Sequence, residues 1–538
     1  MAPKHGAVPE AEELLRGLAT AGQLVHVEHL PARPPGFGDL ARPLPPELES
    51  CVPPGGLWAH QATAIDLARA GRSVAVATGT ASGKTLCYQL PIAEASLGEH
   101  RGTALLLYPT KALAQDQLRS LGKLDVPGLV AATYDGDTPN PQRAWIRRHA
   151  TAVLTNPDML HVGILPRHEP WSGFLGRLKY VVVDELHTLR GIFGTHVAHV
   201  LRRLRRLCSR YGSSPTFVFG SATIGSPGAL ASSLCGLPVE EVTEDRSPRG
   251  ARVFALWNPP LVDEAAGVRA SGIGETAALL ATFVRSGYRA IAFTRSRKGS
   301  ELVAAAARRQ LPRELAGRVR PYRGGYLATE RREIEGQLFG GELLGVAATN
   351  ALELGIDVGG LDACLLNGFP GTIASLWQQA GRAGRARQQS AAVLVAGEDQ
   401  LDQWFMAHPA EMFTRPPEPS VVNPSNPFVL HPHLACAAYE QPLTEGDEEL
   451  WGDDLEEGVR RLVLEDTLVV RDQRAVYAGR GSPAAKVGLR TGSSNEYRIV
   501  LADTARLIGT VDESRAFTTV HPGALYLHQG RHYRVEHL

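Results

Sequence analysis

The chain has little cysteine and no excess of charge. Its six cysteines are never within four residues of one another; they are Cys51, Cys87, Cys208, Cys235, Cys364 and Cys436. That spacing argues against a zinc ribbon or zinc finger, and nothing in it indicates a disulfide framework. The formal net charge is zero, so no overall electrostatic field indicates a polyanionic partner. Any nucleic-acid surface must therefore be local.

Long apolar runs are also missing. Residues 1–10 lack the apolar core of a signal peptide, and no run of about eighteen apolar residues occurs. We therefore expect a soluble, cytoplasmic protein without a membrane partner. At 538 residues the chain exceeds the size of one hydrophobic core, so three or more domains are expected.

Two series of short apolar runs are present, and helical stretches separate their members. The first series comprises residues 73–78, 103–108, 152–155, 180–184 and 217–220, and the second comprises 290–294, 344–349, 363–367 and 391–396. Fully apolar strands that alternate with helices are typical of parallel sheets covered on both faces. The sequence thus predicts an α/β fold with two tandem parallel-sheet lobes.

Composition changes along the chain suggest further parts. Residues around 1–55 and 409–432 are rich in proline, 455–464 has a helical pattern, and 467–477 has a hairpin pattern. The expected divisions are an N-terminal arm (1–55), a first lobe (56–250), a linker (251–270), a second lobe (271–400), a winged-helix-like region (401–490) and an incomplete β-rich region (491–538).

A glycine-containing loop follows the first predicted strand. It reads Thr80-Ala81-Ser82-Gly83-Lys84-Thr85, directly before a predicted helix. Such a loop turns its backbone N–H groups toward phosphates at a helix N-terminus, where the helix dipole favours anions. Lys84 is expected to reach the β- and γ-phosphates of ATP, and the Thr85 hydroxyl to bind Mg²⁺.

An acidic pair ends the strand at Val181–Val183. Asp184 and Glu185 follow this strand at the edge of the sheet where ligands of α/β proteins bind. Asp184 is predicted to hold Mg²⁺ through water. Glu185 is predicted to orient and activate the attacking water as the general base.

Four more side chains complete the predicted ATP site. Arg382 and Arg385 lie in the second lobe, and a γ-phosphate transition state requires cationic groups of this kind. If they act from the opposite lobe, catalysis depends on lobe closure. Gln378 is expected near the γ-phosphate. Gln61 precedes the loop by the distance expected of a glutamine that reads adenine.

These motifs and their order resemble the superfamily 2 DExH-box helicases, here with the sequence Asp184-Glu185-Leu186-His187. Three further segments are similar to the RecQ-related bacterial helicases of the mitomycin repair factor A type. They are Tyr108–Gln117, Thr155–Leu160 and Arg190–His196. The resemblance covers residues 57 to 396.

The resemblance implies two RecA-like lobes, ATP-dependent translocation 3′ to 5′ on single-stranded DNA, and unwinding of tailed or forked duplexes in DNA repair. We expect a nucleoid-associated monomer. Members of this family carry a C-terminal domain with a four-cysteine zinc site, and this sequence has no matching cysteines. A fragment and a variant without the zinc module both fit that difference.

The resemblance also assigns a nucleic-acid track, which binds the backbone without reading the sequence. Its residues are Thr110, Lys111, Asn156, Asp158, Thr294, Arg295 and Thr349. Asp357 matches the family position that touches the ATP ribose. His187, Ser221 and Thr223 match positions that couple the state of the γ-phosphate to lobe closure.

The helix at 201–210 carries five arginines on one side and apolar residues on the other. Its basic side fits a solvated face or a DNA contact, and the sequence leaves both open. Two functions besides a DNA helicase also stay open. One is an RNA helicase of the DEAD type, which has aspartate at the position of His187, and the other is a DNA-stimulated ATPase switch without unwinding activity.

Overall fold

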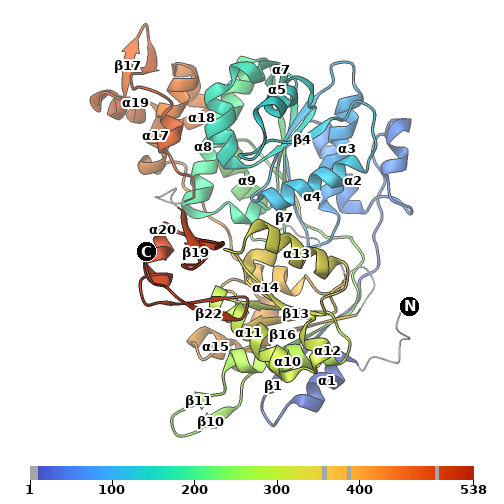
Figure 1. The fold of residues 1–538 in the computed structure, drawn as a ribbon. Helices are drawn as coiled ribbons and strands as arrows, with labels where there is room; N and C mark the ends of the chain where they lie inside the picture. Colours follow the sequence, from blue (N-terminus) through green and yellow to red (C-terminus); the bar gives the residue numbers. More distant parts are fainter. Residues whose placement is uncertain (1–9, 354–359, 385–388, 491–495) are drawn as a thin grey trace. The chain divides into compact units, whose positions relative to one another are not determined.

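The computed structural model describes residues 10–353, 360–384, 389–490 and 496–538 (Figure 1). They form two compact units. The first unit comprises residues 36–246 and 418–492, and the second comprises 1–35, 247–417 and 493–538. Each unit contains a seven-stranded sheet. Within the described ranges, no helix is both long and apolar enough to cross a membrane.

The sheet of the first unit is parallel throughout and has the order β4-β5-β3-β6-β7-β2-β8. Its strands are β2 (Val74–Ala77), β3 (Thr103–Leu107), β4 (Ala131–Thr133), β5 (Ala152–Thr155), β6 (Leu178–Val183), β7 (Thr216–Ser221) and β8 (Glu240–Val242). The helices that surround it include α2 (Ala59–Arg69), α3 (Lys84–Leu97), α4 (Lys111–Gly122), α5 (Asn140–His149), α8 (Gly191–Arg210) and α9 (Pro227–Cys235) (Figure 1). Strands β2, β3, β5 and β7 are buried along their whole length, as their continuous apolar runs predict.

The sheet of the second unit has the order β1-β9-β16-β15-β12-β14-β13. Its strands are β1 (Leu24–Leu30), β9 (Arg252–Trp257), β12 (Ala290–Thr294), β13 (Val319–Tyr322), β14 (Gly345–Ala348), β15 (Ala363–Asn367) and β16 (Ser390–Val395). Its helices include α1 (Ala11–Leu18), α10 (Gly272–Arg285), α11 (Arg297–Gln310), α13 (Ala328–Phe339), α14 (Ile373–Ala380), α15 (Gln400–Ala407) and α16 (Pro409–Thr414). The two parallel-sheet lobes confirm the predicted α/β class.

Two segments differ from the expected arm and linker. Strand β1, within the predicted arm, pairs antiparallel with β9, and β9 lies within the predicted linker. Strand β9 in turn pairs in parallel with β16, so both strands extend the sheet of the second unit. The remainder of the predicted linker forms a hairpin of β10 (Leu261–Asp263) and β11 (Val268–Arg269). The sequence did not predict these two strands because their partners are distant: Leu30 of β1 pairs with Arg252, and Arg252 of β9 pairs with Ser390.

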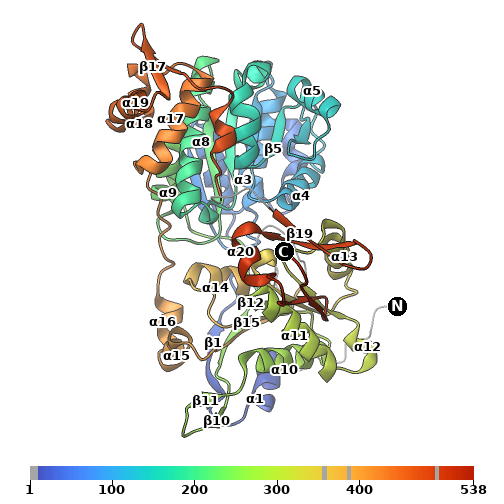
Figure 2. The same cartoon turned by 60° about the vertical axis from the view of Figure 1, so that its left-hand side comes forward.

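Residues 418–492 form a small domain against the first unit's α8. It contains α17 (Pro427–Glu440), α18 (Glu448–Trp451), α19 (Asp454–Leu464), the hairpin β17 (Leu468–Arg471) and β18 (Arg474–Tyr477), and a 3₁₀ turn at Pro483–Lys486. Both views place α17 beside α8 (Figures 1 and 2). An apolar core that includes Leu434, Leu455 and Leu468 joins the helices to the hairpin. The arrangement confirms a winged-helix region in this part of the chain.

The arginines of α8 bind this small domain, so both readings of the basic face were wrong for most of it. Arg203 is completely buried and makes two hydrogen bonds to the Glu440 carboxylate. Arg206 is paired with Asp447 through two hydrogen bonds of 2.6 and 2.9 Å. Arg202 donates to the carbonyl of Leu450 at 3.0 Å. The sequence did not indicate these ion pairs, because the carboxylate partners of Arg203 and Arg206 lie more than two hundred residues away.

Four histidines surround Arg203 in the same interface. Arg203 donates to Nδ1 of His161 at 2.8 Å and to Nδ1 of His433 at 3.2 Å. His433 Nε2 lies 3.0 Å from Nδ1 of His196, and the Trp451 indole donates to Nδ1 of His199 at 3.2 Å. Burial, together with a neighbouring arginine, lowers the pKa of His161 and of His199 to about 3, from an ordinary 6.5. The folded chain therefore keeps both rings neutral.

We expect acid to loosen the contact between α17 and α8. The unfolded state binds more protons than the folded state below pH 6.5, so these histidines stabilise fully above that pH and progressively less toward pH 3. At pH 5.5 the loss is about 1.4 kcal/mol for each of His161 and His199. Hydrogen exchange of α17 at pH 7.5 and 5.5, corrected for intrinsic rates, measures it. An equal change in α10, which is the control helix, would contradict the assignment to these histidines.

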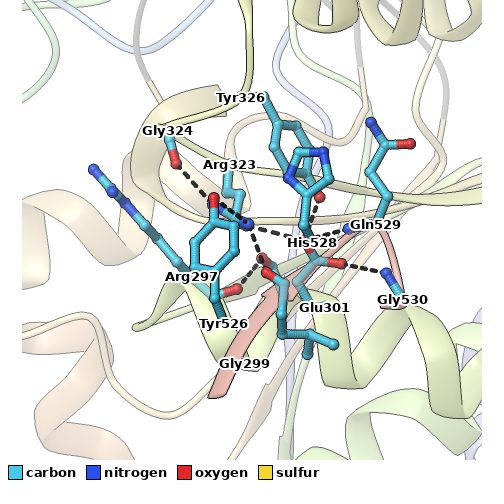
Figure 3. A network of polar contacts seen from close by, with 12 residues as sticks. Arg297, Gly299, Glu301, Arg323, Gly324, Tyr326, Tyr526, His528, Gln529 and Gly530 are labelled. Atoms are coloured by element: carbon cyan, nitrogen blue, oxygen red, sulfur yellow. Dashed lines mark hydrogen bonds and ion pairs between the residues drawn. The ribbon is translucent and has the colours of Figure 1, made fainter. Parts of the chain in front are cut away.

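The last described segment, residues 496–538, belongs to the second unit and forms two hairpins and a helix beside its sheet and helices. They are β19 (Glu496–Val500) with β20 (Leu507–Asp512), α20 (Glu513–Thr519), and β21 (Leu525–His528) with β22 (Arg531–Arg534). A buried carboxylate, Glu301 of α11, anchors the second hairpin by accepting the backbone N–H groups of Gln529 and Gly530, both at 2.9 Å (Figure 3). Glu301 also accepts Arg323 Nε at 3.0 Å. The turn of this hairpin is thereby fixed to the lobe.

Candidate functional site

The loop after β2 has the backbone of a phosphate-binding turn. Ala81 and Gly83 adopt left-handed φ values of +60° and +69°, and α3 begins at Lys84. A Cβ atom on Gly83 would lie 2.5 Å from Gln61 Nε2 and 2.7 Å from the Trp58 ring. Only glycine therefore fits at this position, on both conformational and steric grounds.

Lys84 is folded onto this loop. Its ammonium donates to the carbonyl of Thr78 at 2.9 Å and to that of Gly79 at 2.7 Å. Burial lowers its pKa, and the nearby carboxylates of Glu185 and Asp184 oppose that shift. The charge of Lys84 thus lies among the loop, the strand end and the acidic pair.

Side chains of helix α2 hydrogen-bond to the backbone of this loop. Gln61 accepts the Trp58 N–H at 2.9 Å and donates to the Gly83 carbonyl at 3.0 Å. His60 Nδ1 accepts the Arg246 N–H at 3.2 Å, so its Nε2 carries the proton donated to the Ser82 carbonyl at 2.9 Å. Sequence reasoning singled out Gln61 for adenine and missed His60. In the structure both side chains hold the backbone of the loop.

Asp184 lies where β6 ends. Its Oδ1 accepts the N–H of Glu185 at 2.9 Å, and the Tyr88 hydroxyl is 3.4 Å from its Oδ2. Burial and the charge of Glu185 raise the pKa of Asp184 to about 6. A Cβ atom on Gly220 of β7 would lie 2.5 Å from Asp184 Oδ1, so this neighbour must be glycine. A carboxylate and the Thr85 hydroxyl are hard oxygen donors of the kind that Mg²⁺ prefers, and this donor set fits the ion.

Of the three residues predicted to couple the γ-phosphate to lobe closure, only two lie in contact. His187 Nδ1 lies 3.5 Å from Glu185 Oε2 and 3.5 Å from Ser221 Oγ, so it bridges the acidic pair and the end of β7. Glu185 itself adopts a left-handed φ of +57°. Thr223 is exposed and outside this contact chain. A change at Glu185 would therefore reach β7 through His187.

The predicted track residues of the first unit lie at helix starts. Thr110 Oγ1 accepts the N–H of Leu113 at 3.3 Å, and Asn156 Oδ1 accepts that of Met159 at 2.8 Å. Lys111 is half exposed and pairs with Asp137 at 2.7 Å. Asp158 is paired with Arg490 at 2.9 Å.

Arg490 is a residue that the sequence reasoning missed. Besides Asp158, it donates to the Pro109 carbonyl at 3.1 Å, and its guanidinium stacks over Phe193 at 4.4 Å. It therefore joins the three segments that carry the subgroup resemblance. No local pattern in the sequence indicates this, because Arg490 follows the nearest of them by nearly three hundred residues.

In the second unit, Thr294 is buried and its hydroxyl donates to the Ser296 carbonyl at 3.1 Å. Arg295 is held by Asp399 and Asp402, each at 2.6 Å. Thr349 Oγ1 accepts the N–H of Ala351 at 3.4 Å. The structure thus engages these predicted track side chains in contacts within the lobe.

The predicted catalytic side chains of the second unit lie on or just after α14. Gln378 is buried, and Arg382 donates to the carbonyl of Glu353. Asp357 and Arg385, which the sequence also assigned to the ATP site, lie outside the described residues.

Three family profiles match the chain in succession. They are the DEAD/DEAH box helicase at residues 58–229, the helicase conserved C-terminal domain at 275–387, and the winged helix domain of the ATP-dependent helicase HRQ1 at 422–492.

Whole proteins are similar over most of the chain. The uncharacterized ATP-dependent helicase YprA of Bacillus subtilis (strain 168) is 42% identical over 90% of this chain and 65% of its own length. The ATP-dependent helicase HRQ1 of Saccharomyces cerevisiae is 38% identical over 98% of this chain and 51% of its own. The chain thus spans between half and two thirds of the length of these relatives. A crystal structure of the DUF1998 helicase MrfA bound to DNA and AMPPNP superposes with a TM-score of 0.92 and 40% identity, covering 98% of this chain and 75% of that one.

Proposed function

This chain belongs to the superfamily 2 helicases of the HRQ1 and MrfA type, and on that premise we propose that it is an ATP-dependent DNA helicase. We propose further that it translocates 3′ to 5′ on single-stranded DNA and acts in DNA repair as a nucleoid-associated cytoplasmic monomer. The observation that carries the proposal is the convergence of Lys84, Asp184 and Glu185. Their charges interact at one edge of the first unit's sheet.

The chemistry assigned to these residues is phosphoryl transfer to water. Lys84 binds the β- and γ-phosphates in exchange for its present contacts with loop carbonyls. Thr85 and Asp184 would hold Mg²⁺, which when bound neutralises charge on the phosphates. Glu185 orients the attacking water and accepts its proton. His187 then relays the state of Glu185 to Ser221.

Gln378, Arg382 and Arg385 are proposed to add contacts and positive charge at the γ-phosphate. Thr80, Ala81, Ser82 and Gly83 supply backbone N–H groups, and Gln61 and Asp357 bind the adenosine.

The proposed DNA track consists of side chains that contact the phosphate backbone of the DNA. Thr110, Lys111, Asn156, Asp158, Thr294, Arg295 and Thr349 are its proposed residues. Hydroxyls, amides and a few charges bind phosphates without base recognition, which suits a motor that must release each phosphate as it steps. Tailed or forked duplexes are the proposed substrates, because they present single-stranded DNA beside a duplex.

Strand separation with ATP on four substrates tests this function. They are DNA and RNA duplexes, each with a 3′ or a 5′ single-stranded tail, and Lys84→Ala is run beside the parent chain. We expect unwinding of the 3′-tailed DNA alone and none by the variant. Unwinding confined to RNA would refute the DNA assignment. Steady ATP hydrolysis without any strand separation would instead indicate an ATPase switch.

A further inference from the structure

The first unit contains a basic cavity that neither the ATP site nor the proposed track uses. Its volume is about 600 Å³, within the range of small-molecule sites. Five cationic side chains, Arg42, Arg69, Arg101, Arg177 and Lys179, line it, against two carboxylates, Glu94 and Glu99. Five positive charges less two negative ones leave a formal excess of three.

This cavity lies at the opposite edge of the sheet from the ATP site. Arg101 and Gly102 directly precede β3, and Arg177 directly precedes β6. The phosphate-binding loop, in contrast, follows the carboxyl end of β2, which runs parallel to both strands. A strand of five residues separates the two edges by roughly 15 Å. A ligand here is therefore distinct from the ATP that Lys84 binds.

Some of the five cationic side chains are already paired within the wall of the cavity. Arg69 is paired with Glu94 at 2.8 Å and donates to the carbonyls of Arg42 at 2.6 Å and Pro43 at 2.9 Å. The side chains of Lys179 and Arg101 differ, because both are exposed and neither makes an ion pair among the described residues. These two cations are available to an anionic ligand.

A hydroxyl in the wall of the cavity can also donate to a ligand. Tyr180 lines the cavity, and no hydrogen bond of its hydroxyl occurs within the part of the chain that the structure describes. The hydroxyl oxygen is not one of the buried polar atoms that lack a partner, so it is accessible from the cavity. Burial raises the pKa of Tyr180 to about 12, so the hydroxyl is a donor at neutral pH.

The backbone at the rim is strained. Arg101 has a φ of +43° and closes a turn in which its N–H donates to the Gly98 carbonyl at 2.9 Å. An L-residue with a side chain pays about 1–2 kcal/mol for this conformation, which glycine adopts freely. Strain of this kind concentrates at ligand sites. At position 101 glycine would therefore give a more stable fold than arginine does.

From these observations we propose that the cavity binds a nucleoside phosphate, whose phosphate group contacts Arg101, Lys179 and the Tyr180 hydroxyl. A planar guanidinium presents paired donors that match phosphate oxygens. The volume exceeds what inorganic phosphate fills, and Pro91, Ala95 and the Tyr180 ring add apolar surface for a base. This site goes beyond the helicase activity and does not depend on it.

Calorimetric titration of the full chain with AMP tests the proposal, with inorganic pyrophosphate in a second arm. All variants carry Lys84→Ala, which weakens phosphate binding at the ATP site. Arg101→Gly removes the cation but relieves the backbone, so we expect AMP binding at least about tenfold weaker at an equal or higher Tm. Tyr180→Phe keeps the packing and should weaken AMP about three- to tenfold. The matched control is Lys123→Ala, an exposed lysine on the same unit, and it should bind like its parent.

The two ligands distinguish the sources of the phosphate. AMP bound more tightly than pyrophosphate supports a nucleoside phosphate, and pyrophosphate bound more tightly overturns that identity. No binding of AMP at millimolar concentration by the Lys84→Ala chain overturns the site itself. So does unchanged AMP affinity in both Arg101→Gly and Tyr180→Phe. If the parent chain separates no strands, the helicase proposal is refuted, but the AMP binding measured here is unaffected.

Discussion

Replacing Lys84 with alanine is expected to lower ATP turnover by about a thousandfold or more. The ammonium is the only lysine or arginine group placed within the described loop, where it lies between the Thr78 and Gly79 carbonyls and the acidic pair. Loss of a single neutral donor at a developing charge costs about 2.7–4 kcal/mol, and a desolvated cation on phosphates contributes at least as much. Phosphate release at saturating ATP and DNA measures the effect.

Two further variants make this result specific. Lys123→Ala removes an exposed lysine of the same unit and should turn over ATP at the parent rate. Glu185→Gln should retain nucleotide binding while losing hydrolysis, because it keeps the cation and removes only the base. Turnover near the parent rate in Lys84→Ala would refute the assignment of the loop. Normal hydrolysis by Glu185→Gln would mean that another group activates the water.

Removing the guanidinium of Arg203 is expected to destabilise the contact between α8 and α17 by about 3–5 kcal/mol. Arg203 and Glu440 are both fully or almost fully buried, with side-chain exposures of 0% and 1%. Arg203→Met leaves the Glu440 carboxylate without its cation, and it also takes a donor from His161 and His433. A buried charge left without its partner costs far more free energy than an exposed ion pair contributes.

The double variant Arg203→Met/Glu440→Leu is the control. When both charges are replaced by apolar groups, most of the loss should be regained, because the desolvation cost of the carboxylate disappears with it. The local opening free energy of α17 from hydrogen exchange is the appropriate measurement, since a chain of two units does not unfold in a single step. A single variant that costs less than about 1 kcal/mol, or a double variant no more stable than the single one, would contradict this account.

The two arginine-rich features show how sequence and structure divide the information. The amphipathic pattern predicted a helix at residues 201–210, and the structure has it as the second half of α8, with its apolar side buried. Its basic face was assigned to solvent or DNA, yet Arg203 and Arg206 bind carboxylates at positions 440 and 447. A charge shows its partner only after the chain has folded, and a separation of more than two hundred residues leaves no local signal.

The strand partners follow the same rule. Apolar runs predicted β2, β3, β5 and β12 within one or two residues at each end, because every side chain of a completely buried strand is apolar or small. The half-exposed β1 has the polar residues His26, Glu28 and His29, and only its pairing with β9 makes it a strand. Hydrogen bonds across a sheet depend on register between distant segments, which composition does not specify.

By itself the sequence determined the two α/β lobes and placed the loop proposed to bind phosphate and the acidic pair after their strands, since each depends on neighbours within a few positions. Tertiary structure alone decided that His60 and Gln61 support the loop, that Arg490 joins three separate segments, and that Glu301 holds the turn at Gln529. It also decided that Tyr180 and Arg101 share a cavity. The physical reason is the same in each case: a local motif encodes backbone geometry, whereas burial and the pairing of charges depend on which distant segments the folded chain brings together.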